Sequence, residues 1–445
     1  MNRQPYYHAV FRFLVKFRFI AWCLGYLMGR SLKNAQAISQ GSSVCLVLKS
    51  SRLRGDIGFL EREARRKQSN LIFVQVPDNW LGRFYRWFYW YKDIVSEHTE
   101  ISLERIEYRK FLHKFLPALR QVLDVRVVLG PQINDAVCID WGAVLTELDV
   151  PYVVFHREGY MGSALEEEHL ASFGRSGRRF EGSLLAVQTE VMRRVFIDSR
   201  FVTPERIVVS GTLRMDDWLI PQKSINSVDE RQERGKLLPE WVTLFSFGPG
   251  TGITMAEYWP EGWKEGEYLA ETVRSTHVAL ARFALRNPWV PVMIKPKWFK
   301  RWKEHLLLIL NEAGISLEDV PNLQICEDID AQAQIKRSRL IVGYGSTTLL
   351  EAAIVGKPVI VPEFGEIAAG QKWASSKTYP DVSDCFDLAM SEEHLLSLLE
   401  LKYKNPEVSE KCMERRRRAF ERYVSYLDGS ATVRSLRMLE NLAHN

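Results

Sequence analysis

Short apolar runs alternate with amphipathic segments through the first half of the chain. Runs that are apolar almost throughout are typical of parallel strands buried on both faces. They predict strands at residues 43–48, 70–76, 125–129, 150–155 and 207–209. Residues 110–123 and 135–148 are expected to be helical, and the glycine-containing stretch after the first strand is expected to be a polar loop. We place this first, doubly wound domain at residues 41–220.

A second alternation follows residues 221–238, a polar stretch with little apolar pattern that is the best linker candidate. It predicts strands at residues 242–247, 290–294, 323–326, 340–342 and 359–361. We place the second domain at residues 239–390 and expect C-terminal helices over residues 391–445. The run Arg415 to Arg418 is expected to be a solvated helix face. The predicted fold class is therefore α/β, with two doubly wound, Rossmann-like domains.

Residues 1–40 form a basic and aromatic N-terminal segment. Residues 1–55 contain nine Lys or Arg and no acid, although the net charge of the chain is only +5. The uncharged apolar part, residues 19–29, is shorter than the roughly 20 residues that span a bilayer. Two interpretations stay open: a helix on an anionic membrane surface, or a helix packed on the first domain. Residues 80–91, dense in aromatics, could likewise contact sugars or lipid, or form a core helix.

Composition bounds the class of protein. The 445 residues are 46% apolar and 26% charged, which is typical of a globular enzyme of two domains. Six scattered cysteines without a CxxC pair indicate reduced thiols in the cytoplasm and argue against a structural zinc site. Positive charge is confined to one end and no nucleic-acid-binding module is present, so nucleic acid is not an expected partner.

The most informative motif joins a strand, a glycine turn, a helix and a second strand over residues 340–361. Such a unit places free backbone N–H groups at the carboxyl edge of a sheet, where anionic ligands bind. Thr348 and Glu351 have the spacing of a capping box. The candidate nucleotide-binding residues of this motif are Gly345, Ser346, Thr347, Thr348 and Glu351. An ordinary βαβ unit whose glycines serve only the turn is the alternative.

Two other strand ends in the second domain carry candidate phosphate-binding residues. The first is the glycine-rich turn after residues 242–247, and the second is a Lys-Pro-Lys sequence after residues 290–294. The candidates are Gly248, Gly250, Thr251, Lys295 and Lys297. The chain has neither a P-loop Lys-Ser/Thr pair nor a Rossmann glycine fingerprint with its acid, which argues against ATP and NAD.

The first domain has a candidate reaction centre after the strand at residues 150–155. His156, Arg157, Glu158 and Gly159 follow that strand directly, at the edge where ligands bind in open α/β sheets. His156 and Glu158 are the candidate catalytic groups, with Glu158 as general base or nucleophile. An Arg–Glu pair in a loop is the alternative.

The strand at residues 207–209 is followed by a second polar segment, Ser-Gly-Thr-Leu-Arg-Met-Asp-Asp. Arg214 is a candidate for bidentate binding of a carboxylate. Asp216 is the candidate second catalytic carboxylate, with Asp217 as its alternative. A helix N-terminal acid stabilised by the helix dipole is an equally good explanation of Asp217.

These motifs resemble those of a known class of enzymes. The run Gly-Ser-Thr-Thr-Leu-Leu-Glu-Ala-Ala-Ile-Val-Gly-Lys-Pro-Val-Ile resembles the donor-nucleotide segment of GT-B glycosyltransferases and sugar-nucleotide 2-epimerases. The Val-Ser-Gly-x-x-Arg-x-Asp segment resembles one found in surface-carbohydrate biosynthesis proteins. With His-Arg-Glu-Gly and Lys-Pro-Lys, the set resembles the retaining β-Kdo transferases of lipopolysaccharide and capsule assembly. Lys297 stands where several of those families have His.

The resemblance implies a GT-B fold and transfer of Kdo from CMP-Kdo to a lipid-linked, lipopolysaccharide or capsule glycan. It implies a metal-independent reaction with no cofactor beyond the nucleotide-sugar donor. Lys295, Lys297 and Arg214 would hold the phosphate and the sugar carboxylate. The enzyme would be cytoplasmic and peripheral to a bacterial inner membrane. A UDP-sugar transferase, a 2-epimerase, and a non-catalytic membrane-surface carbohydrate-binding protein remain alternatives.

Overall fold

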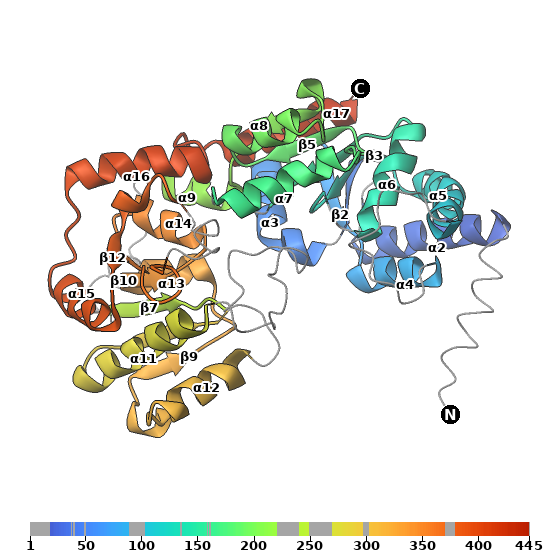
Figure 1. Ribbon diagram of the computed structural model, residues 1–445. Helices are drawn as coiled ribbons and strands as arrows, with labels where there is room; N and C mark the ends of the chain where they lie inside the picture. The colour runs from blue at the N-terminus through green and yellow to red at the C-terminus, as the bar shows by residue number, and fades with distance from the viewer. Residues whose placement is uncertain are drawn as a thin grey trace, which may run out of the picture. The chain divides into compact units, whose positions relative to one another are not determined.

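The computed structural model describes most of the chain as two compact units (Figure 1). Unit 1 comprises Met1–Glu158, Leu170–Leu219 and Asp428–Asn445, and unit 2 comprises Gly159–His169 and Ile220–Leu427. The described residues are 18–36, 38, 41–48, 50–88, 103–133, 136–157, 159, 162–219, 240–248, 269–296, 302–369 and 379–444.

Unit 1 contains a sheet of six parallel strands in the order β2-β1-β3-β4-β5-β6. The strands are β1 (Ser43–Val47), β2 (Leu71–Gln75), β3 (Val125–Gly130), β4 (Tyr152–Phe155), β5 (Leu184–Val187) and β6 (Ile207–Val209). Five of them match the predicted apolar runs. β5 was not predicted, because its four residues are too short a run to stand out without the pairing partners on either side.

Helices cover both faces of this sheet, as burial of parallel strands requires. They are α2 (Arg18–Ala35), α3 (Ser50–Arg66), α4 (Asp78–Phe88), α5 (Leu103–Val122), α6 (Ala136–Glu147), α8 (Glu190–Asp198), η1 (Pro204–Arg206), η2 (Leu213–Met215), α9 (Asp216–Leu219) and α17 (Ala431–His444). α7 (Ala164–Arg175) carries the chain from unit 2 back into unit 1. The C-terminal helix α17, red in Figure 1, packs with α3 on the face formed by β1 and β3.

The expected polar loop after β1 is wrong: this segment is helix α3. Leu53, Ile57, Leu60 and Ala64 recur at helical spacing and are buried against the sheet. Gly55 lies on the exposed side of the helix, where no atom approaches its Cβ position. Burial of one apolar stripe therefore outweighs the low helix propensity of the glycines.

Residues 80–88 of the aromatic stretch lie in helix α4, whose buried rings belong to the core. The Phe84 ring lies 5.3 Å from the Phe115 ring, and the Phe88 ring lies 5.5 Å from the Phe111 ring. For these two side chains the core interpretation is confirmed. Those of residues 85–87 lie outside the described part of the chain.

The N-terminal helix α2 packs on α5 of its own unit. A Cβ at Gly25 would lie 2.2 Å from the Phe115 carbonyl oxygen, so the two helix backbones approach closely there. The opposite side of α2 exposes Phe19 and Leu27, at 74% and 62% of their surface. No helix among the described residues is long and apolar enough to cross a membrane.

Unit 2 contains a second sheet of six parallel strands, in the order β12-β11-β10-β7-β8-β9. The strands are β7 (Trp241–Phe245), β8 (Val292–Lys295), β9 (Leu323–Ile325), β10 (Ser338–Gly343), β11 (Val359–Pro362) and β12 (Asp387–Ala389). Its helices are α11 (Ala270–Arg286), α12 (Trp302–Glu312), η4 (Leu317–Asp319), α13 (Ala331–Arg337), α14 (Thr348–Ile354), η6 (Ser383–Cys385), α15 (Glu392–Lys404) and α16 (Glu410–Tyr423). The predicted α/β class with two Rossmann-like sheets is confirmed. The expected linker at residues 221–238 lies outside the described residues.

The arginine run on α16 is only partly a solvated face. Arg416 is buried, and its guanidinium donates to the carbonyl oxygens of Cys385 at 3.0 Å, Ala353 at 3.2 Å and Lys357 at 2.8 Å. Burial lowers the pKa of Arg416. Its neighbour Arg418 is exposed and pairs with Glu414 one turn away. One arginine thus fastens α16 to three backbone segments.

We predict that Arg416→Leu destabilises unit 2 by about 3 kcal/mol, because it leaves three buried carbonyl groups without their donor. Arg418→Leu, its matched control, should change stability by less than about 0.5 kcal/mol. Urea unfolding, monitored by hydrogen exchange of α14 and β11, measures the stability of both variants. Equal effects of the two substitutions would contradict the assigned role of Arg416.

Candidate functional site

Unit 1 has a polar pocket at the carboxyl ends of β4, β5 and β6. Its cavity is small, about 20 Å³. Its lining comprises Asp56, Phe155, His156, Arg157, Ala186, Gln188, Ser210, Gly211, Thr212, Leu213 and Arg214. The structure therefore brings together His156, Arg157 and Arg214, which the sequence placed after two different strands. Ligands of open α/β sheets bind at this edge.

A buried ion pair forms the wall of this strand-end pocket. Asp56 Oδ2 lies 2.7 Å from Arg157 Nε, and Asp56 is 4% exposed. Burial raises the pKa of Asp56, while the charges of Arg157 and Arg214 act in the opposite direction. Gln188 Nε2 donates to the Arg157 carbonyl oxygen at 2.8 Å and fixes the loop that follows β4.

His156 is buried at the end of β4. Its backbone N–H donates to the Ala186 carbonyl oxygen at 2.9 Å, which extends the β4–β5 pairing by one residue. Its ring meets the Phe196 ring edge-on, with 5.6 Å between centroids. The predicted catalytic Glu158 lies outside the described residues, and Gly159 belongs to unit 2. Their assigned roles stay predictions.

Asp56 and Gln188 were missed by the sequence analysis. Asp56 is the first acid of the chain, but the surrounding segment was interpreted as a loop. Only helix α3 turns this carboxylate toward the ends of strands that come about 100 residues later. The one signal in the sequence was that Asp56 is the first acid after a long basic segment. Gln188 follows β5, the strand that was not predicted.

Asp216 has the contacts of a helix cap. Its two carboxylate oxygens accept from the backbone N–H groups of Ala431 at 3.0 Å and Thr432 at 2.7 Å, at the start of α17. Burial raises the pKa of Asp216, and these N–H donors oppose the shift. The catalytic assignment of Asp216 stays a prediction, but its observed contacts account for an acid at this position. Asp217 is exposed and pairs with Arg62 at 3.6 Å.

Chemically, the strand-end pocket combines an imidazole, a shielded carboxyl and two guanidinium groups. The guanidiniums of Arg157 and Arg214 suit a carboxylate or a phosphate. Asp56 and His156 can hold or move a proton, because both are shielded from water at the pocket wall.

Unit 2 has a second candidate site at the carboxyl edge of its sheet. β7 lies between β10 and β8, and the strand order reverses between β7 and β10. At such a reversal the connecting loops diverge and leave room for a ligand. The turn after β10 has Gly345 at φ +60°, in the left-handed region that favours glycine. The Tyr344 ring beside it lies 5.6 Å from the ring of Phe247, which follows β7.

The start of α14 differs from the expected capping box. Thr347 precedes the helix with helical backbone angles and no side-chain cap, and the Ser346 hydroxyl accepts from Thr348 N–H at 3.3 Å. Glu351 instead accepts from Gln332 Nε2, and is buried. Packing of α13 against α14 supplies this partner, which sequence spacing does not reveal.

A fully ordered hydrogen-bond chain lies behind the end of β7. His277 Nδ1 is 2.6 Å from the Val273 carbonyl oxygen, so Nδ1 carries the proton, because a carbonyl only accepts. The neutral ring then accepts at Nε2 from the Ser246 hydroxyl at 2.8 Å. Trp302 Nε1 donates to the same hydroxyl oxygen at 2.8 Å. These hydrogen bonds link β7, α11 and α12 close to Gly248.

Lys295 ends β8 beside this network. Its Nζ donates to the Glu327 carbonyl oxygen at 3.4 Å. Burial lowers the pKa of Lys295, while the Cys326 thiol and the nearby Asp330, Asp328 and Glu327 act in the opposite direction. The other candidates of this edge, Gly250, Thr251 and Lys297, lie outside the described residues.

Comparison with known proteins identifies the fold. No family model matches the chain, and the search of curated proteins found no match. Among solved structures, the UDP-GlcNAc 2-epimerase of Methanocaldococcus jannaschii aligns with a TM-score of 0.50 and 13% identity, over 89% of this chain and 98% of that one. This chain has a GT-B-type fold.

Two further solved structures are similar to this chain. The UDP-GlcNAc 2-epimerase of Neisseria meningitidis, bound to UDP-GlcNAc, has a TM-score of 0.49 and 11% identity over 91% of this chain and 100% of that one. A glycosyltransferase of Rickettsia africae has a TM-score of 0.46 and 11% identity over 92% of this chain and 100% of that one. At these identities the likeness concerns the fold.

We predict that Asp216→Ala loosens helix α17, because two backbone N–H groups at its start lose their acceptor. The expected cost is about 1–2 kcal/mol, and hydrogen exchange of α17 should accelerate accordingly. Asp217→Ala is the matched control and should leave the exchange of α17 unchanged. Unchanged exchange in Asp216→Ala would refute the capping role.

We predict that unit 2 loses stability at mildly acidic pH through His277. Burial lowers the pKa of His277 to about 4 from its ordinary 6.5, so the unfolded state takes up the proton first. The stabilisation is complete above about pH 6.5 and falls as the pH approaches about 4, by about 2 kcal/mol between about pH 7 and about pH 5. Urea unfolding at both pH values measures it. His277→Gln should lower stability at neutral pH and remove this slope, whereas an unchanged slope would contradict it.

Proposed function

We propose that this protein is an enzyme that acts on a UDP-sugar and binds its nucleotide at the carboxyl edge of the unit 2 sheet. The observation that carries the proposal is the strand-order reversal between β7 and β10, where the turn at Gly345 stands beside the end of β7. UDP rather than CMP is supported by the names of similar structures, which include UDP-GlcNAc 2-epimerases.

The described residues at this edge of the unit 2 sheet suit the diphosphate of a nucleoside diphosphate. The turn from Gly345 to Thr348 has backbone N–H groups and two hydroxyls near one another. Gly248 offers a second stretch of backbone without a side chain. Lys295 supplies a positive charge at the end of β8. The hydrogen bonds among Ser246, His277 and Trp302 hold β7 and α12 together beside Gly248 and Lys295.

The first candidate reaction is epimerisation at the carbon next to the anomeric centre. It is supported by the name of the Methanocaldococcus jannaschii structure. Such a reaction removes the proton at that carbon and returns one to the opposite face, and it needs no acceptor.

The second candidate is sugar transfer to an acceptor at a membrane surface, and helix α2 favours it. This helix exposes Phe19, Trp22 and Leu27, and carries Arg18, Arg30 and Lys33 with no acid. Exposed apolar residues beside lysine and arginine suit an anionic lipid surface. With a CMP-linked donor in place of UDP, this candidate would become the predicted transfer of Kdo from CMP-Kdo, with Glu158 as general base or nucleophile.

Binding of nucleotides tests the proposal. We expect UDP and UDP-GlcNAc to raise the melting temperature and CMP to leave it unchanged, because a ligand that binds the folded state stabilises it. Gly345→Ala should abolish the UDP effect. Gly314→Ala is the matched control, since Gly314 also has a positive φ in unit 2 but lies in the turn after α12. A shift with CMP alone would replace UDP by the Kdo type of donor, and no shift with any nucleotide would refute the proposed site.

Product analysis then separates the two reactions. Incubation with UDP-GlcNAc alone should give the C2 epimer, detected by NMR, if the protein is an epimerase. Release of UDP that requires a glycolipid acceptor in anionic vesicles would identify a transferase. In that case Phe19→Ser with Leu27→Ser should weaken vesicle binding without changing UDP binding.

A further inference from the structure

A larger cavity of about 350 Å³ lies on the other face of the unit 1 sheet. Tyr152 and Val154 of β4 line it, whereas Val153 and Phe155 face the core formed with α3 and α17. It shares no lining residue with the strand-end pocket. Its volume is within the range of small-molecule sites, roughly 300–1,000 Å³.

Beside this cavity, two arginines pair with two acids. Arg105, which is 8% exposed, pairs with Asp140 at 3.1 Å and with Glu181 at 3.4 Å. Arg109 pairs with the same two carboxylates, at 2.7 Å and 2.8 Å. Two arginines and two acids therefore balance one another.

Two more arginines, Arg178 and Arg179, line the cavity beyond this balanced group. Neither has a carboxylate partner within 4.0 Å in the part of the chain that the structure describes. Arg179 Nη1 donates to the carbonyl oxygens of Gly174 at 3.1 Å and Arg178 at 2.8 Å. The Arg178 guanidinium lies over the Phe173 ring at 4.6 Å. Burial lowers the pKa of Arg178, and the neighbouring charge of Arg105 acts in the same direction. An anion placed there would favour the charged form of Arg178 and oppose this lowering of its pKa.

The floor of the cavity is apolar and rigid. Tyr152, Phe180, Phe201 and Ile133 supply it. The Tyr152 ring is packed so tightly that a Cβ at Gly142 would lie 2.8 Å from it. The Phe180 backbone N–H donates to the Phe201 carbonyl oxygen at 2.8 Å, and Arg206 donates to the Phe180 carbonyl oxygen at 3.1 Å. The floor is therefore preformed, with no ordering left to do on binding.

We propose that this cavity binds an organic anion, in which a phosphate monoester or carboxylate meets Arg178 and Arg179 and an apolar body lies on the aromatic floor. A guanidinium pair recognises either anion by bidentate hydrogen bonds. The floor distinguishes such a ligand from free phosphate. The site is separate from the nucleotide edge of unit 2 and does not depend on the function proposed above.

Phenyl phosphate is a probe with both features. We expect calorimetric titration to show saturable binding of phenyl phosphate that persists with saturating UDP, and binding at least about tenfold weaker for inorganic phosphate and for benzyl alcohol. Phenyl phosphate should also slow hydrogen exchange of residues 176–182. Equal binding of inorganic phosphate, competition by UDP, or no saturable binding would each overturn the proposal.

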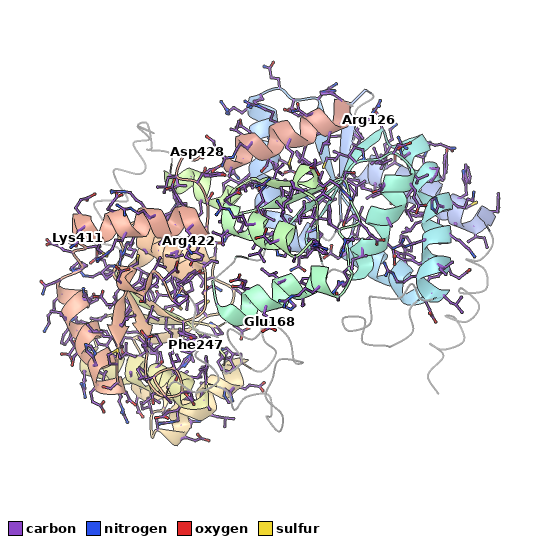
Figure 2. All side chains as sticks on the ribbon, turned by 45° about the horizontal axis from the view of Figure 1, so that its top comes forward. Arg126, Glu168, Phe247, Lys411, Arg422 and Asp428 are labelled. Atoms are coloured by element: carbon purple, nitrogen blue, oxygen red, sulfur yellow. The ribbon has the colours of Figure 1, made fainter. Side chains whose placement is uncertain are left out.

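Charge variants locate the contact. Arg178→Gln should weaken phenyl phosphate binding about tenfold, whereas Arg178→Lys should recover part of the loss, because lysine keeps the charge but not the bidentate geometry. The matched control is Arg126→Gln, which removes an exposed arginine of β3 outside the cavity (Figure 2). It should leave affinity within about twofold. Unchanged melting temperatures of all three variants confirm folding, and equal losses in Arg178→Gln and Arg126→Gln would overturn the assignment.

Discussion

Both units depend on parallel pairing of every strand. A parallel strand cannot be reached by a tight hairpin, so the chain returns through a longer crossover connection, which is helical for most of these strands. All carboxyl ends then meet at one edge. In unit 1 this places the residues after β4, β5 and β6 around a single pocket, and in unit 2 it places the turn after β10 beside the end of β7. Sites appear at these edges because loops there are free to vary while the sheet is not.

Buried charged side chains then fasten elements that the sheets alone would leave loose. Asp216 holds the start of α17, and Arg416 ties α16 to the carbonyls behind β11 and η6. Asp56 is held by Arg157 in the pocket wall. Each charge is satisfied by backbone groups or by an opposite charge, as burial requires. These buried charged side chains thus fix the ends of helices and loops, because their partners offset the free-energy cost of burying a charge.

The two candidate sites differ in character. The edge of unit 2 offers backbone N–H groups, hydroxyls and one lysine, which suits a phosphate group that is held but not transformed. The strand-end pocket of unit 1 gathers a carboxyl, an imidazole and two guanidiniums, groups that exchange protons and bind anions. The basic cavity on the other face of unit 1 has Arg178 over the Phe173 ring, with Arg179 beside it in the lining. It is therefore a binding site in our interpretation rather than a reaction centre.

The sequence by itself determined the class of fold and most strands, because runs buried on both faces must be apolar throughout. It also placed His156, Arg157 and Arg214 at strand ends, where parallel topology makes residues converge. It could not determine α3 or β5, whose identity depends on a sheet formed by distant strands. Only the tertiary structure revealed Asp56 beside Arg157, the capping of α17 by Asp216, and Glu351 paired with Gln332. These contacts join residues far apart in the chain, and their partners are fixed by packing rather than by spacing.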